Sequence, residues 1–257
     1  MALFTDGPIN GTLELQIYEN GILQLANTEQ IDLDGKSVLA QGEIASELML
    51  FFVRRFRHQD YPWSVTVGKA IDVGDVVVTP PLRRWHAHKT LALVYRDAYN
   101  NQLNDRYQGK WAEYEQLAKA SAASYLQMGV GLVTGPIPKA AMPALTAVPG
   151  GGPAATYYVG VAWVNSAGQP GALSDIVQLT TLTGQQLQVV PASAPPSAAG
   201  WNVYVGESPQ SMALQNSSPI STGGNWILTT TLQTGSPPDE GQAPVWFLRD
   251  ERLMERG

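Results

Sequence analysis

The sequence predicts a multidomain α+β protein in which an α-helical bundle is followed by an all-β sandwich and a short C-terminal tail. Charge gives the first reason: residues 1–140 carry 13 Lys or Arg and 15 Asp or Glu, whereas residues 141–248 carry no base and four acids. Proline gives the second, because 14 of the 18 prolines follow Gly135. We therefore predict a helical domain at 1–130, a linker at 131–153 rich in Gly, Pro and Ala, a β domain at 154–243 and a tail at 244–257.

The first domain shows helical periodicity. A long helix is predicted to begin near Asp34, a candidate N-cap, and to end at residues 61–63, because Pro62 cannot continue it. A shorter helix is expected before it, at 13–26. The β-branched segment 71–79 is either a strand or an extended loop. Apolar residues at three- and four-residue spacing support the long helix: Ile44, Leu48, Phe51, Phe52 and Phe56.

A third helix is predicted to start at Pro80, because Thr79 can cap it and proline is tolerated in a first turn. Residues 100–105 either break the chain before a fourth helix or continue into it. The fourth helix has a face marked at alternating spacing by Tyr107, Trp111, Tyr114, Ala118, Ser121, Tyr125 and Met128. Its aromatic residues could stack on bases or sugars, but a core or subunit interface is the better interpretation. We assign Tyr107, Trp111, Tyr114 and Tyr125 to a subunit interface.

The second domain has the alternation and turn residues of short strands. Residues 156–164 alternate in strand fashion and are followed by the turn Asn165–Gly168. Further strands are expected at 176–181, 186–190, 200–205 and 226–232. Turn residues recur about every ten positions, which favours a sandwich of roughly seven strands.

The tail combines a large apolar cluster with mixed charge. Such side chains are costly to expose, since each contributes about 1.5–3 kcal/mol when fully buried. They either close the β domain, pack back on the helices, or bind a partner. We assign five of them to partner binding: Trp246, Phe247, Leu248, Leu253 and Met254.

Local motifs for catalysis, metals and phosphate are weak. The histidines are His58, His86 and His88, and the last two would lie on different helical faces. The run at 150–152 is flanked by prolines and lacks the Lys-Ser/Thr of a phosphate-binding loop. There is no Gly-x-Ser-x-Gly elbow, and the acids Asp97 and Asp105 each adjoin an arginine. We therefore expect no catalytic residue, no cofactor and no metal.

Composition narrows the partners. The net charge of -6 does not favour nucleic acid or an anionic membrane. Basic clusters at 54–58 and 83–85 could meet DNA phosphate, but cations placed at a helix C-terminus are the better interpretation, since 54–58 lies at a predicted helix end. The absence of cysteine excludes disulfides and thiolate metal sites. We see no signal peptide at the start and no apolar run of about 18 residues that could span a bilayer.

Two segments of the first domain resemble a known family. Residues 84–107, RWHAHKTLALVYRDAYNNQLNDRY, and residues 31–44, IDLDGKSVLAQGEI, look like the helices of tailed-bacteriophage head-to-tail adaptor (connector or neck) proteins. The resemblance covers roughly residues 1–130. The second domain, through the strand-like segment at 200–206, resembles a fibronectin type III or immunoglobulin-like decoration domain.

The resemblance implies a structural virion protein rather than an enzyme. It implies a homo-oligomeric ring, a dodecamer if the family is followed, that joins the portal protein to tail or nozzle proteins. DNA would pass through the ring without sequence-specific binding, and no membrane would be involved. The protein would be made in the host cytoplasm and reside at the virion neck. The family also implies portal docking, which we assign to the tail.

Two other functions compete with the adaptor. One is a glycan-binding virion or tail protein that acts through its β sandwich. The other is a cell-wall hydrolase with a β-sandwich targeting module, which the scarcity of acids in the second domain disfavours.

Overall fold

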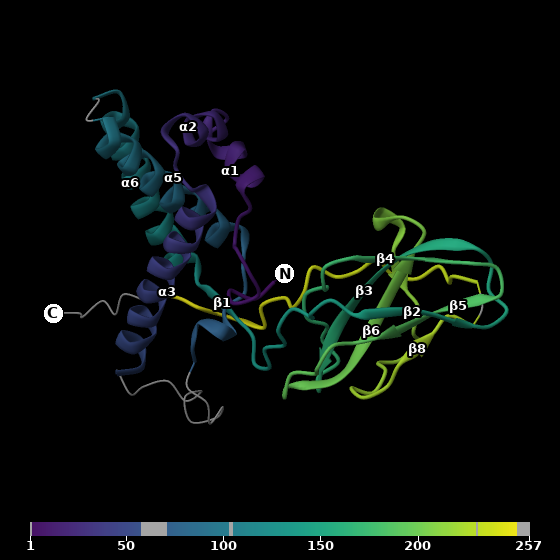
Figure 1. Ribbon diagram of the computed structural model, residues 1–257. Helices are drawn as coiled ribbons and strands as arrows, with labels where there is room; N and C mark the ends of the chain where they lie inside the picture. Colours follow the sequence, from purple (N-terminus) through teal and green to yellow (C-terminus); the bar gives the residue numbers. More distant parts are fainter. Residues whose placement is uncertain (1, 58–70, 103–104, 230, 251–257) are drawn as a thin grey trace. The chain divides into compact units, whose positions relative to one another are not determined.

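A computed structural model describes residues 2–57, 71–102, 105–229 and 231–250, and it shows an α+β chain with helices first and antiparallel sheets second (Figure 1). The chain forms two compact units, and both are discontinuous. The helical unit comprises Gly7–Leu132 and Pro244–Gly257, and the β unit comprises Met1–Asp6 and Val133–Ala243. The predicted boundaries are therefore corrected, because the tail belongs to the helical unit.

The helical unit contains five α-helices among its described residues: α1 (Thr12–Tyr18), α2 (Ile22–Glu29), α3 (Leu33–Arg57), α5 (Pro80–Gln102) and α6 (Asp105–Met128). The single helix predicted at 13–26 is thus two, because the chain turns extended at Glu19 and restarts after Gly21. The start of α5 at Pro80 is confirmed. The predicted helix end at 61–63 lies outside the described residues.

The first turn of α3 corrects one assignment. The helix begins at Leu33, so Asp32 precedes it, and its carboxylate accepts the backbone N–H of Gly35 at 3.0 Å. This is the side-chain contact of an N-cap. Asp34, predicted to be the cap, instead accepts a hydrogen bond from the Thr12 hydroxyl.

The helix α5 lies at the centre of the unit and is buried along most of its length. Lys36 pairs with Asp97 and Glu43 with Lys89, so α3 and α5 run antiparallel. The rings of Tyr95 and Tyr114 stack with centroids 5.5 Å apart, and α6 also runs back along α5. The buried apolar core includes Leu15, Ile22, Leu33, Leu91, Tyr95 and Tyr107. The tyrosines that we assigned to a subunit interface are part of this unit's own interior.

The segment at 71–79 is a short turn followed by an extended stretch. Its 3-10 turn, η1 (Val73–Asp75), leads to Val76, which bridges Leu132 in antiparallel fashion. β1 (Val130–Leu132) also pairs antiparallel with β9 (Trp246–Leu248), as Figure 1 shows where the yellow segment meets β1. Residues 246–248 of the predicted tail therefore form a strand of the helical unit.

The β unit contains seven strands in two antiparallel sheets among its described residues. One sheet has the order β2-β5-β8 and the other β4-β3-β6-β7. Residues from both sheets share one apolar core, which confirms a sandwich with the predicted strand count. The strands are β2 (Ala144–Pro149), β3 (Ala155–Asn165), β4 (Val177–Thr181), β5 (Gln185–Val190), β6 (Ala198–Gly206), β7 (Ala213–Leu214) and β8 (Trp226–Ile227).

The predicted linker at 131–153 is corrected as well, since β2 lies inside it. The glycine run after β2 forms a hydrogen-bonded turn beside β5: the N–H of Gly150 donates to Gly184 and the N–H of Gly184 donates to Gly152. Glycine is needed here because a Cβ on Gly152 would lie 2.0 Å from the carbonyl oxygen of Gln185.

Gln242 joins the two ends of the long segment of the β unit, Val133–Ala243. Its side-chain oxygen accepts the N–H of Ile137 at 2.7 Å, and its amide nitrogen donates to the carbonyl of Gly135 at 2.9 Å. Gln242 is itself buried. The segment Val133–Ala243 lies in the chain between β1 and β9, which pair with each other, so it is an insertion into the helical unit.

Candidate assembly surfaces of the helical unit

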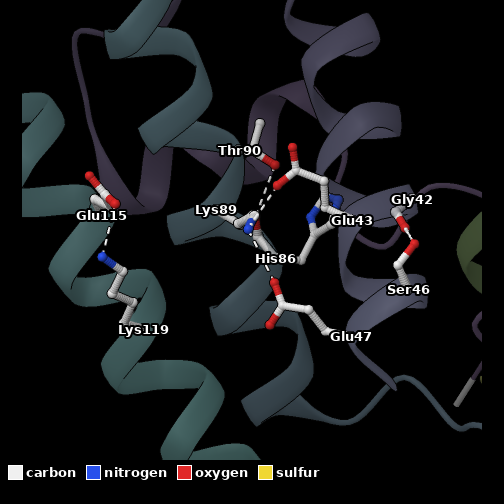
Figure 2. A network of polar contacts seen from close by, with 9 residues as sticks. All are labelled: Gly42, Glu43, Ser46, Glu47, His86, Lys89, Thr90, Glu115 and Lys119. Atoms are coloured by element: carbon white, nitrogen blue, oxygen red, sulfur yellow. Dashed lines mark hydrogen bonds and ion pairs between the residues drawn. The ribbon is translucent and has the colours of Figure 1, made fainter. Parts of the chain in front are cut away.

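Polar side chains between α3 and α5 form a closed network. Lys89 lies between Glu43 and Glu47, with its Nζ 2.8 Å and 3.2 Å from their carboxylate oxygens (Figure 2). Burial opposes the charge of Lys89, but the hydrogen bonds and charges of the two glutamates outweigh it and raise the pKa of the amine. Lys89 therefore stays protonated and acts as an ion-pair bridge rather than a proton acceptor.

The two described histidines serve different helix contacts. His86 is buried, and its Nε2 donates to the carbonyl of Ser37 on α3. The Nδ1 of His88 lies 2.8 Å from the Ser121 hydroxyl on α6. Burial lowers the pKa of both rings, which holds them neutral. The expectation that the two histidines point to different partners is confirmed.

The α6 stripe is buried rather than available to a second subunit. Tyr107, Tyr114 and Tyr125 are buried, and the half-buried Trp111 stacks on Tyr99 with centroids 6.0 Å apart. The interface assignment of the three tyrosines is therefore wrong, because their side chains are already enclosed by this chain. The same spacing predicts a core face and an interface face, so the sequence could not separate the two.

Glu19 anchors the hydroxyl end of this tyrosine cluster. Its carboxylate accepts a hydrogen bond from the Tyr114 hydroxyl at 2.8 Å and forms an ion pair with Lys110 at 3.1 Å. Burial alone would raise the pKa of Glu19, but these bonds outweigh burial and lower it. The group is an ionised structural acceptor between α1 and α6.

The outer side of α3 carries an uncharged apolar ridge that sequence reasoning missed. It consists of Val38, Leu39, Met49, Leu50 and Val53, which are between 40% and 66% exposed, with the small residues Gly42 and Ser46 between them. The signal was present, because these positions repeat at three and four residues like the buried ones. The apolar spacing noted from the sequence includes Ile44, Leu48 and Phe52, which lie on the buried face of α3.

A second apolar feature lies where the start of α5 meets the end of α6. This α5–α6 groove has a volume of about 460 Å³ and is lined by Pro80, Pro81, Arg84, Leu117, Ala120 and Met128, together with two serines. Met128 is 48% exposed. The groove thus offers apolar contact with a single guanidinium at its rim.

Trp246, Phe247 and Leu248, the described residues among the five assigned to portal docking, are only partly accessible. Leu248 is buried in the helical unit, Trp246 is half-buried and Phe247 is 52% exposed. Arg55 secures the segment by donating to the carbonyl of Arg249 at 2.6 Å. Leu253 and Met254 lie outside the described residues. Of the alternatives, packing back on the helices is what the structure shows for Leu248.

Within the described ranges, no cluster of three or more His, Asp or Glu side chains is arranged to hold a metal ion. No helix in the described part of the chain combines the length and hydropathy that crossing a bilayer requires. No protein-family model matches the sequence, and no curated protein matches it significantly. Function is therefore inferred from the α3 ridge, the α5–α6 groove and the exposed part of β9.

Proposed function

We propose that this protein is a structural subunit of a homo-oligomeric virion ring of the head-to-tail adaptor kind, joining a portal to a tail. The observation that supports the proposal most is the α3 ridge. A soluble monomer rarely gathers several large, exposed apolar side chains along one helix, and such patches mark surfaces that other proteins cover. The resemblance of residues 31–44 and 84–107 to adaptor helices agrees with this proposal, since both segments belong to the helical unit.

The interior of the helical unit supports a structural role in a second way. Its polar groups are used to hold helices together: Lys89 bridges two glutamates, His86 binds Ser37, and Glu19 binds Tyr114. Each of these contacts holds its titratable side chain in one protonation state. A helical bundle whose titratable side chains are held in this way suits a subunit that must keep its shape.

We also propose that the β unit is a fibronectin type III or immunoglobulin-like module inserted into the adaptor. The order β4-β3-β6-β7 opposite β2-β5 corresponds to the C′-C-F-G and B-E strands of that class. The third strand of the smaller sheet, β8, follows β7 in the chain and lies beside β5. Such a module would decorate the ring while DNA passes through the helical part.

The exposed residues at the tail remain the proposed portal contact. Val245 and Phe247 are 51% and 52% exposed on either side of the half-buried Trp246. The buried Leu248 takes no part in docking, because its side chain anchors the strand.

The deciding experiment mixes the purified chain with a candidate portal and examines the product by electron microscopy and mass measurement. A closed ring attached to the portal, twelve-fold if the family is followed, is the expected result. The double variant Val245→Ser/Phe247→Ser should stay folded and lose attachment. A chain that never associates with itself or with any portal would refute the proposal.

A further inference from the structure

The α3 ridge and the α5–α6 groove lie at opposite edges of the three-helix layer α3-α5-α6. On α6, the residues that face α3 are Glu115, Lys119 and Ala122, which line one cavity together with Glu43 and Glu47. A helix turns about 100° per residue, so Ala120 and Ser124 of the groove point away from that side. By the same count, Val38, Met49 and Val53 point away from Glu43 and Glu47 on α3.

The two surfaces also lie at the same end of the layer. His88 on α5 meets Ser121 on α6, and Lys89 meets Glu47 on α3. Met49 and Val53 therefore lie near the level of the groove. Because α3 and α6 both run antiparallel to α5, they are parallel to each other.

We propose that the α3 ridge of one copy of this chain packs into the α5–α6 groove of the next copy. The fit is one of shape and polarity: large side chains such as Met49 and Val53 protrude on one edge, and prolines with the small Ala120 form a hollow on the other. Gly42 allows the neighbouring backbone to approach closely. The groove's floor is apolar, and Arg84 supplies a polar rim of the kind that surrounds interface cores.

Electrostatics favours this pairing, because the net charges beside the two surfaces are opposite in sign. The charged residues that flank the ridge, Glu43 and Glu47, are paired with Lys89 within the same chain. Two glutamates and one lysine leave a net negative charge beside the ridge, whereas the ionisable side chain that lines the groove is Arg84. An unpaired charge brought into an interface is costly, and the opposite charge beside the ridge offsets the cost of covering Arg84.

The consequence is a head-to-tail contact. Two different patches on opposite edges generate a closed ring if the rotation closes, and an open filament if it does not, whereas a single self-complementary patch would stop at a dimer. This inference rests on the proposed ring, and it names the surfaces that build it.

The absence of cysteine from the chain makes a direct test possible. The double variant Met49→Cys/Ser124→Cys should form a ladder of disulfide-linked species under mild oxidation, and each single variant should form none. A matched control, Met49→Cys/Gln108→Cys, uses another exposed position of α6 and should give no ladder.

Three other outcomes would overturn the inference. Linked dimers from Met49→Cys alone would show that α3 pairs with α3, and linked dimers from Ser124→Cys alone would show that α6 pairs with α6. A ring on the portal without a ladder in the double variant would overturn this interface and leave the adaptor role standing. A ladder without any portal binding would support the interface and refute the adaptor role instead.

Discussion

The Nδ1 of His86 lies 3.0 Å from the side-chain amide nitrogen of Asn10. That amide nitrogen also donates to the carbonyl of Arg83 at 2.7 Å, which fixes it as a donor. Nδ1 must therefore accept, while Nε2 carries the proton and donates to Ser37. A second proton on the ring would face a donor at close range in a buried site.

Acid should therefore destabilise the protein through His86. Burial holds the pKa of the His86 ring in the folded protein below its ordinary value near 6.5. The neutral ring therefore stabilises the fold fully above that pH. This stabilisation is lost as the pH falls through the folded pKa. Lowering the pH from 7.5 to 5.5 should therefore reduce the free energy of unfolding through this residue. Urea unfolding at the two pH values measures the change.

The variant His86→Gln separates this effect from the other titrating groups. It should be less stable than the natural chain at pH 7.5, because the buried hydrogen bonds are remodelled, yet lose less on acidification. Equal losses in both proteins would show that His86 does not carry the pH dependence.

The hydroxyl of Tyr125 should be a liability. It is buried and lacks a hydrogen-bond partner within the described part of the chain. Replacing it by Tyr125→Phe should raise the free energy of unfolding by about 1 kcal/mol. Tyr107→Phe is the matched control, because the Tyr107 hydroxyl donates to Glu29 at 2.7 Å, and its loss should cost about 1–3 kcal/mol. Thermal unfolding that ranks the two variants the other way would contradict this account.

The glycine turn after β2 should tolerate a methyl group at one position and reject it at the next. At Gly152 a Cβ would collide with the carbonyl oxygen of Gln185, whereas at Gly151 nothing lies within 4 Å. Gly152→Ala should destabilise the β unit by about 1–3 kcal/mol, and Gly151→Ala should stay within about 0.5 kcal/mol. Chemical denaturation followed by tryptophan fluorescence compares them, and similar stabilities would refute the packed turn.

Shortening a side chain of β9 should lower the stability of the helical unit strongly only where that side chain is buried. Leu248 is buried there, so Leu248→Ala should cost about 2–5 kcal/mol in helix unfolding monitored by circular dichroism. Phe247→Ala removes a half-exposed side chain and should change stability by well under that amount. Unaltered helix stability in Leu248→Ala would mean that the strand contributes nothing to the unit.

Local residue patterns predicted the structural elements that depend on a few neighbouring residues. The start of α5 at Pro80 and the strand that became β3 follow from residue-level signals that act over a few neighbours. The pairing of β1 with β9 joins Val130 to Leu248, and no local pattern encodes a contact across that separation. The predicted linker at 131–153 was wrong for the same reason, since it contains β2 and a glycine turn beside β5.

The candidate site was harder to predict than the fold. Tyr107 and Tyr125 share helical spacing with any interface stripe, and only the position of α5 shows that they face inward. The α3 ridge is equally periodic, and it became recognisable when the inner face was seen to be filled by Ile44 and Leu48. Periodicity identifies the faces of a helix, while the neighbours decide which face remains free.

The insertion of the β unit between β1 and β9 sets an order of events during synthesis. A ribosome makes α6 and β1 before it makes the β unit, and it makes β9 only afterwards. The helical unit must therefore wait with β1 paired on the Val76 side alone while more than a hundred residues emerge, whereas the β unit can complete its two sheets as soon as β8 is available. Because domains fold as units during translation, the module with the later sequence is able to reach its native state first.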